Sequence, residues 1–325
     1  MRLFIFGSTG DLVKRKILPA LHHIPKLEVY AIGRKNISRE EYHKGYCPEC
    51  EIQFTNRLHY INVDFDNLYE EIKNYIKEKE ENYFYLSLPP DMILKVLKEL
   101  VKVENNTNIR ILIEKPFGSS LKEAKKLKKF IYREKLEENI FLADHYLFKD
   151  NIPQIKNFSR IKIVSLEKVG LENRGYYDSI GALKDMIQSH LLNLLLKITR
   201  INIKEIIIKS AEFKQYKEYE QELGMKSSTE TFVKLELDYK GKKIELITGK
   251  AFDKKLGFIE IDGERYNLGE ENSYIKLFQS FFNNKKKEFP TIEQALETWK
   301  LSEKIIAKKK EVDYYPKNSL AENFL

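Results

Sequence analysis

Short apolar runs recur along the first part of the chain, and segments with helical spacing separate them. Consecutive Val, Ile, Leu, Phe and Tyr residues are typical of strands that are covered on both faces of a parallel sheet. The runs span residues 3–6, 27–32, 58–63, 83–88, 109–113 and 140–143. This alternation predicts an α/β domain over residues 1–150 with a Rossmann-like, doubly wound parallel sheet, whose ligands bind at the carboxyl ends of the strands.

The pattern changes after residue 150, where the strand-like stretches become longer. They span residues 161–169, 203–214, 231–239, 243–248 and 258–261, with a hairpin turn predicted at Tyr239-Lys240-Gly241-Lys242. Helices are expected at residues 179–200, 273–283 and 291–310. Residues 151–325 therefore predict a second, α+β domain with a mostly antiparallel sheet.

Charge and hydropathy argue against a membrane protein and against a nucleic-acid-binding protein. No stretch reaches the roughly 18 apolar residues of a membrane span, and the N-terminus lacks a secretory pattern, so we expect a cytoplasmic protein without a membrane partner. The 57 basic and 49 acidic residues give a net charge of +8 and are spread along the chain. They predict a solvated surface rather than a nucleic-acid footprint, and the positive excess favours small anionic ligands.

The only cysteines, Cys47 and Cys50, stand in a Cys-Pro-Glu-Cys segment between His43 and His59. Thiolates and imidazoles at such a spacing can close a tetrahedral zinc site. A single C-x-x-C is half of the usual zinc signature, however, so we expect no metal. The alternative is a turn whose cysteines are reduced or form a local disulfide.

A glycine-containing turn follows the first apolar run. Its sequence is Gly7-Ser8-Thr9-Gly10-Asp11-Leu12, and Lys14, Arg15 and Lys16 come next. Glycines permit a tight turn and the close approach of a ligand, while free N–H groups at the start of the following helix attract an anion. Arg34 follows the second predicted strand, where an NAD site would carry an acidic residue. Its guanidinium suits the 2′-phosphate of NADP.

Further polar residues follow later strands at the same predicted edge of the sheet. Two strands end in prolines, at Leu88-Pro89-Pro90 and at Glu114-Lys115-Pro116. Pro116 either begins a helix or holds a cis bond that fixes the turn, and Lys115 would point its ammonium into the cleft. The segment Asp144-His145-Tyr146-Leu147-Phe148-Lys149 could bind a phosphate, with His145 and Lys149 on one face if it is helical.

His190 lies on the apolar stripe of the long helix predicted at residues 179–200. A lone histidine on such a stripe is more often a packed core residue than a general base. Asp185 stands five positions earlier, about 140° round an α-helix, and is poorly placed to orient the imidazole. A carboxylate from elsewhere would be needed.

Five motifs in this order resemble the glucose-6-phosphate dehydrogenase family. They are the glycine turn with its basic residues, Leu86-Ser87-Leu88-Pro89-Pro90, Glu114-Lys115-Pro116-Phe117-Gly118, Asp144-His145-Tyr146-Leu147, and Gly175-Tyr176-Tyr177-Asp178 leading to Asp185-Met186-Ile187-Gln188-Ser189-His190-Leu191-Leu192. Fainter similarity continues through residues 248–255 and the Trp299 helix. The chain is shorter than usual members of the family, mainly in the second domain.

The resemblance implies roles for individual residues. His190 would be the general base that takes the proton of the sugar C1 hydroxyl, with Asp144 orienting it and Lys115 beside the reacting groups. The implied NADP contacts are Gly7, Ser8, Thr9, Gly10, Asp11, Leu12, Arg34, Leu88, Pro89 and Lys115. The implied sugar-phosphate contacts are Lys16, Lys115, His145, Tyr146, Lys149, Glu167, Asp185, His190, Lys250 and Lys255. Phe148, Ser189 and Lys255 depart from the family pattern, and the first and the last of these belong to the implied sugar-phosphate pocket.

The implied reaction is NADP-dependent oxidation of D-glucose 6-phosphate to 6-phospho-D-glucono-1,5-lactone, the entry to the oxidative pentose phosphate pathway, in a homodimer or higher homo-oligomer. Two alternatives stay open. One is a sugar dehydrogenase of the inositol and glucose-fructose oxidoreductase type, although that class is not expected to carry Asp144-His145-Tyr146-Leu147. The other is an NADP-binding sensor without turnover, which the retained His190, Asp144 and Lys115 disfavour.

Overall fold

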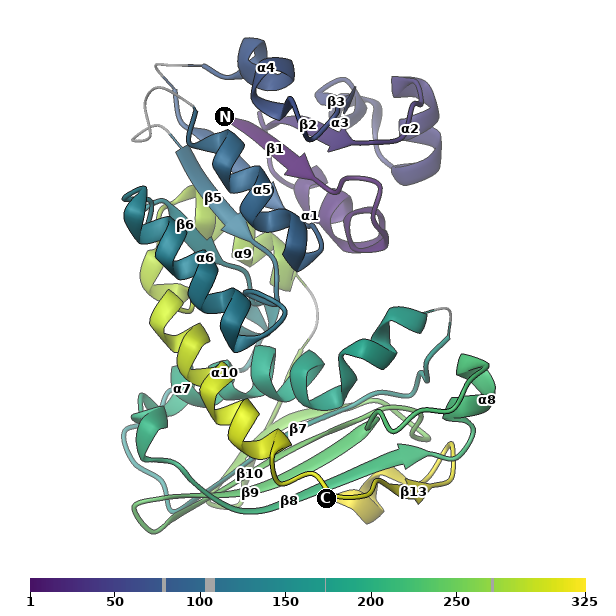
Figure 1. The fold of residues 1–325 in the computed structure, drawn as a ribbon, viewed down its shortest axis with the longest axis vertical. Helices are drawn as coiled ribbons and strands as arrows, with labels where there is room; N and C mark the ends of the chain where they lie inside the picture. The colour runs from purple at the N-terminus through teal and green to yellow at the C-terminus, as the bar shows by residue number, and fades with distance from the viewer. Residues whose placement is uncertain (78–79, 103–108, 173, 270–271) are drawn as a thin grey trace. The chain divides into compact units, whose positions relative to one another are not determined.

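The computed structural model describes residues 1–77, 80–102, 109–172, 174–269 and 272–325, and the chain divides into two compact units (Figure 1). The first unit holds residues 1–148 and 272–292, and the second holds 149–271 and 293–325. This division differs from the predicted continuous domains because helix α9 (Ser273–Phe282) belongs to the first unit. There Phe281 packs edge-on against Tyr83 and Phe141, with ring centroids 5.5 and 5.1 Å apart.

A six-stranded sheet of parallel strands forms the centre of the first unit. The strands are β1 (Arg2–Phe6), β2 (Glu28–Gly33), β3 (Leu58–Asn62), β4 (Asn82–Leu86), β5 (Ile109–Ile113) and β6 (Ile140–Leu142), in the order β3-β2-β1-β4-β5-β6. Each coincides with a predicted apolar run. The doubly wound parallel sheet is thus confirmed, and the carboxyl ends of β1, β2 and β4 meet at one edge.

Short helices connect these strands. They are η1 (Val13–Ile17), α1 (Leu18–His22), α2 (Arg39–Tyr46), α3 (Ile52–Thr55), α4 (Leu68–Ile72), η2 (Lys73–Tyr75), α5 (Pro90–Leu100), α6 (Leu121–Arg133) and η4 (His145–Phe148), with η8 (Lys286–Glu288) later in the chain. Helix α6 begins where the Ser120 hydroxyl accepts the Glu123 N–H at 3.2 Å, which satisfies one of the unpaired donors of the first turn. Helices α5 and α6 lie over the face of the sheet near β5 (Figure 1).

The second unit is built on a seven-stranded, mostly antiparallel sheet, as predicted. Its strands are β7 (Arg160–Leu166), β8 (Ile207–Tyr216), β9 (Phe232–Tyr239), β10 (Lys242–Gly249), β11 (Leu256–Ile261), β12 (Glu264–Asn267) and β13 (Asp313–Tyr315), in the order β12-β11-β7-β10-β9-β8-β13. The parallel pairs are β10 with β7 and β13 with β8. The hairpin between β9 and β10 is confirmed, and its central residues Lys240 and Gly241 have φ values of 53° and 82°, as a type I′ turn requires.

The helices of the second unit depart from the prediction at several points. They are η5 (Gly175–Ser179), η6 (Leu183–Leu191), α7 (Leu192–Thr199), η7 (Ile203–Glu205), α8 (Tyr219–Leu223), α10 (Ile292–Ile306) and η9 (Ala321–Phe324). Helix η7 occupies the start of the stretch predicted as a strand at 203–214, and η5, α8 and η9 were not predicted. The single α-helix predicted at residues 179–200 is wrong, because its first part, η6, is a π-helix that precedes α7. Helices η6, α7 and α10 lie along one face of the sheet (Figure 1).

Within the described ranges, none of the helices combines the length and the apolar character that a membrane span demands.

Candidate active site

The glycine turn after β1 requires glycine at its first position. Gly7 has a φ of +74°, and a Cβ built there would lie 2.0 Å from the carbonyl oxygen of Ser87. The same Cβ would lie 3.3 Å from Leu88, so two of the predicted cofactor segments adjoin. The turn is closed by the Gly10 N–H, which donates to the Gly7 carbonyl at 2.9 Å. Any side chain at Gly7 would therefore fill the space beside the backbone.

Ser8, the next residue of the turn, is fully buried. Its N–H donates to the Ile32 carbonyl at 3.2 Å, and its carbonyl accepts the Tyr42 hydroxyl at 3.0 Å. Its own Oγ atom is buried without a hydrogen-bond partner among the described residues. A buried hydroxyl without a partner is costly unless a ligand satisfies it. The turn therefore fits the phosphates of a dinucleotide cofactor, which this hydroxyl and the backbone N–H groups other than those of Ser8 and Gly10 would hold.

Arg34 follows β2 directly and is exposed. The neighbouring Lys35 is fixed from two sides, since its ammonium donates to the Tyr46 hydroxyl at 2.7 Å and its carbonyl accepts the Tyr60 hydroxyl at 2.6 Å. Asp11, predicted to contact the cofactor, forms an exposed ion pair with Arg15 at 2.7 Å. Lys16 is exposed on η1.

The segment after β5 carries a buried carboxylate beside Lys115. Glu114 accepts the Tyr85 hydroxyl at 2.7 Å and the Lys115 N–H at 3.1 Å. Burial raises the pKa of Glu114, and the Tyr85 hydrogen bond opposes part of that rise. The Lys115–Pro116 peptide bond is cis, one of the two possibilities that the sequence left open. Pro89 lies between β4 and α5 and immediately precedes α5.

The segment after β6 is a single 3₁₀ turn, η4 (His145–Phe148), rather than an α-helix. The shared face of His145 and Lys149 was expected only if the segment is an α-helix, and that condition is not met, since η4 ends before Lys149. Asp144 is buried and caps this turn by accepting the Tyr146 N–H at 3.0 Å. The His145 ring stacks on Tyr274 of α9 with centroids 5.0 Å apart.

His190 and Asp185 both lie on the π-helix η6 in the second unit. A π-helix closes its hydrogen bonds between residues five apart, so positions 185 and 190 are neighbours along the helix. The predicted separation of about 140° assumed α-helical geometry and is wrong for this segment. His190 itself is 1% exposed. The π-helix therefore presents a carboxylate and an imidazole from adjacent turns.

An ion pair in this unit joins two predicted sugar-phosphate residues, Glu167 and Lys250. The Lys250 side chain is 4% exposed, and its ammonium lies 4.8 Å from the centroid of the Tyr177 ring. Burial, with the nearby Asp185 carboxylate, raises the pKa of Tyr177 well above its usual range, so its hydroxyl stays protonated. Lys255 is exposed and precedes β11, and Lys149 is buried.

Sequence reasoning gave Tyr177 no role, although it stands in the quoted Gly-Tyr-Tyr-Asp motif and lies under Lys250. Asp144 and His190 belong to different units, so their pairing stays a prediction. The same holds for a phosphate grip that combines His145 and Tyr146 with Lys149, Lys250 and Lys255.

The residues of the conceivable zinc site have other partners. Cys47 and Cys50 are joined by a disulfide. The His43 Nε2 atom lies 2.9 Å from the Leu58 carbonyl, and the His59 Nε2 atom lies 3.0 Å from a Glu28 carboxylate oxygen. Of the two alternatives to zinc, the structure contains the local disulfide.

Comparison with known proteins gives evidence about the family that is independent of the site geometry. Residues 4–154 match the family model described as glucose-6-phosphate dehydrogenase, NAD binding domain, and residues 145–202 match that described as glucose-6-phosphate dehydrogenase, C-terminal domain. The chain is 31% identical over 284 residues to glucose-6-phosphate 1-dehydrogenase of Helicobacter pylori, which covers 71% of this chain and 67% of that protein. It is 33% identical over 233 residues to the Rhizobium meliloti enzyme, covering 59% of this chain and only 48% of the relative.

Solved structures show the same fold. A crystal structure of glucose-6-phosphate 1-dehydrogenase from Mycobacterium avium aligns with a TM-score of 0.85 at 21% identity, over 98% of this chain and 94% of that one. A structure described as glucose-6-phosphate dehydrogenase in complex with its substrate glucose-6-phosphate aligns with a TM-score of 0.82 at 19% identity, over 98% and 95%. A myo-inositol dehydrogenase from Corynebacterium glutamicum is more distant, with a TM-score of 0.67 at 11% identity over 94% and 96%.

Proposed function

The chain belongs to the glucose-6-phosphate dehydrogenase family, and we propose that it oxidises D-glucose 6-phosphate to 6-phospho-D-glucono-1,5-lactone with NADP. One observation carries the proposal: both family models match in order, and together they include the glycine turn, Lys115, Asp144 and His190. A protein that only bound the nucleotide would need the glycine turn, but it would have no need for Asp144 and His190.

The proposed chemistry begins at His190, which takes the proton of the C1 hydroxyl as hydride leaves the same carbon. The bound nicotinamide supplies the acceptor for that hydride. Asp144 would hold the imidazole in the required tautomer and stabilise the imidazolium that forms. Asp185 is a further carboxylate, and unlike Asp144 it lies on the same π-helix as the base, one turn away.

Glu167 and Lys250 are suited to a sugar phosphate because they place an acceptor and a donor side by side. A carboxylate accepts hydrogen bonds from sugar hydroxyls, and an ammonium donates to hydroxyl or phosphate oxygens. His145, Tyr146, Lys149 and Lys255 would complete the phosphate grip, and Lys16, Lys115 and Asp185 would contact the sugar.

We propose NADP rather than NAD because Arg34 stands where an NAD site carries an acidic residue. The guanidinium can bind the 2′-phosphate through two parallel hydrogen bonds. A cytoplasmic location and a homodimer or higher homo-oligomer also stay predictions from the sequence.

Steady-state assays of the purified protein test the proposal. Glucose 6-phosphate, galactose 6-phosphate and free glucose are each supplied with NADP and with NAD, and formation of the reduced nicotinamide is followed by absorbance. We expect the highest kcat/KM with glucose 6-phosphate and NADP. Absence of turnover with every aldose 6-phosphate would remove the proposed activity.

A further inference from the structure

Hydrogen bonds and an ion pair connect the C-terminal segment, residues 313–325, to two stretches of chain. One stretch is the backbone at Lys250, and the other is the loop that follows Glu167. We propose that Tyr315, in the C-terminal segment, is a positioning residue that sets Lys250 for sugar-phosphate binding. This inference rests on the proposed function, because it deepens the role given there to Lys250.

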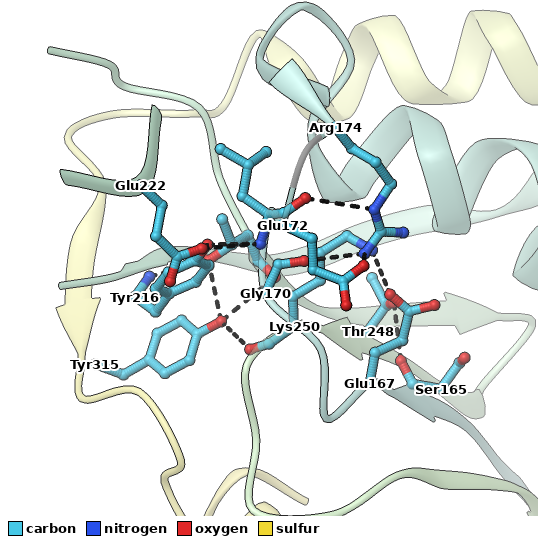
Figure 2. A network of polar contacts seen from close by, with 12 residues as sticks. Ser165, Glu167, Gly170, Glu172, Arg174, Tyr216, Glu222, Thr248, Lys250 and Tyr315 are labelled. Atoms are coloured by element: carbon cyan, nitrogen blue, oxygen red, sulfur yellow. Dashed lines mark hydrogen bonds and ion pairs between the residues drawn. The ribbon is translucent and has the colours of Figure 1, made fainter. Parts of the chain in front are cut away.

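Tyr315 holds the backbone of Lys250 directly. It is 1% exposed, and its hydroxyl donates to the Lys250 carbonyl at 2.7 Å. The same hydroxyl lies 3.0 Å from the Thr231 hydroxyl, and the ring stacks on Phe252 with centroids 5.3 Å apart at 15°. Figure 2 shows the Tyr315 ring reaching Lys250 from β13. Stacking thus fixes the Tyr315 ring and hydrogen bonds fix its hydroxyl. The hydrogen bond to the Lys250 carbonyl holds that peptide group in place.

The residue after Lys250 needs such support. Ala251 is buried and has a φ of +60°, in the left-handed region that a non-glycine residue rarely occupies. Its carbonyl accepts the Asn318 N–H at 2.7 Å, and its own N–H donates to the Val169 carbonyl at 3.0 Å. A strained turn of this kind persists only where surrounding contacts hold it. The C-terminal segment provides the contacts on one side, and the loop after β7 provides those on the other.

A second connection reaches the loop that follows Glu167. The Lys317 ammonium lies 2.6 Å from a carboxylate oxygen of Glu222, and that carboxylate accepts the Tyr216 hydroxyl at 2.8 Å. The Tyr216 hydroxyl in turn accepts the Leu171 N–H at 2.8 Å. Figure 2 shows Glu222 and Tyr216 on one side of this loop and the Glu167–Lys250 pair on the other. Both members of the ion pair therefore follow the position of the C-terminal segment.

Removing only the Tyr315 hydroxyl should loosen Lys250 while the ring keeps its packing. Tyr315→Phe is the test variant, and Tyr314→Phe, at the adjacent position whose side chain is 58% exposed, is the matched control. We expect KM for glucose 6-phosphate to rise about three- to tenfold in Tyr315→Phe, the usual worth of one hydrogen bond, with KM for NADP unchanged. Tyr314→Phe should match the wild type in both constants.

The split between the two KM values separates positioning from folding. A variant that merely lowered the folded fraction would lose kcat with both KM values unchanged, and that result would overturn the inference. Equal KM values for glucose 6-phosphate in Tyr315→Phe and the wild type would overturn it too. A wild-type protein without aldose 6-phosphate turnover would instead overturn the proposed function, on which the inference depends.

A second variant keeps the test decisive if Tyr315→Phe fails to fold. Lys317→Met removes an exposed cation whose ion pair with Glu222 is the outer link of the second connection. We expect KM for glucose 6-phosphate to rise about twofold, since partly exposed ion pairs contribute little each, with KM for NADP again unchanged. An unchanged KM for the sugar phosphate in this variant would remove the second connection, and with it the claim that the C-terminal segment positions the ion pair.

Discussion

The glycine turn of the first unit and the Glu167–Lys250 pair of the second are built in opposite ways. The turn is made of backbone, and Gly7 is required because a Cβ there would lie 2.0 Å from the Ser87 carbonyl oxygen. The pair is made of charged side chains that strands β7 and β10 bring together across 83 positions of sequence. The glycine turn requires a residue without a side chain at position 7, whereas the Glu167–Lys250 pair requires two charged side chains.

This difference decides what each site tolerates. A backbone site keeps its function when surface charges change, but it fails when one methyl group is added. A side-chain site loses affinity for its ligand when a charge is removed. Variants in the two units should therefore change the kinetic constants of different ligands.

The largest expected effect is on turnover, in His190→Asn. Loss of a positioned general base should lower kcat by about 10² or more, while the dissociation constant of NADP, measured by calorimetric titration, stays that of the wild type. The asparagine keeps a hydrogen-bonding side chain in the buried position. A variant that turned over as fast as the wild type would show that another group is the base.

Gly7→Ala should come next and should act on the first unit alone. Gly224→Ala is its matched control, because Gly224 has a φ of +79° but nothing within 4 Å of a Cβ. We expect the control to lose roughly 1–2 kcal/mol of unfolding free energy from the left-handed conformation. Gly7→Ala should lose at least about 3 kcal/mol in urea titrations, because the backbone must also move, and should bind NADP much more weakly. Equal losses in the two variants would mean that the turn is not a tight cradle.

Arg34→Ala should have a smaller effect, limited to one cofactor. Loss of a charge-assisted contact to the 2′-phosphate should raise KM for NADP about ten- to a hundredfold. NAD lacks that phosphate, so its KM in the same variant is an internal control and should stay within about twofold of the wild type. A parallel rise for both cofactors would assign Arg34 to the folding of the turn.

The strands of the first unit were predictable because a strand buried on both faces is a continuous apolar run, whereas the short strands β12 and β13 of the second unit were not predicted. The glycine turn was predictable for a related reason, since the need for glycine at position 7 is local. The π-helix was not, because Leu183, Ile187 and Leu191 have the spacing of an α-helix, and sequence periodicity does not report a hydrogen bond that skips to the fifth residue.

Contacts between distant segments were also beyond local patterns. Helix α9 was predicted within one residue, yet nothing in its sequence assigns it to the first sheet rather than the second. Tyr315 is a similar case, since its hydroxyl bonds the Lys250 carbonyl, 65 positions away, and no motif marks it. What local sequence predicts is the backbone site, whereas the surroundings of the side-chain site come from the tertiary structure.

The smallest expected effect concerns Glu114, the buried carboxylate of the first unit. Its substitution tests whether ionisation of this group changes the free energy of unfolding. Burial raises its pKa in the folded state above the value of about 4.3 in the unfolded chain. Its contribution to stability is therefore fully present below about pH 4 and is lost as pH rises through the folded-state pKa.

Glu114→Gln removes this dependence and keeps an acceptor for the Tyr85 hydroxyl. We expect the unfolding free energy of the variant, minus that of the wild type, to grow between about pH 4 and pH 7. Glu49→Gln, an exposed carboxylate removed, gives the baseline. A difference that stays flat with pH for Glu114→Gln would show that the Lys115 charge and the Tyr85 hydrogen bond fully offset burial of this carboxyl.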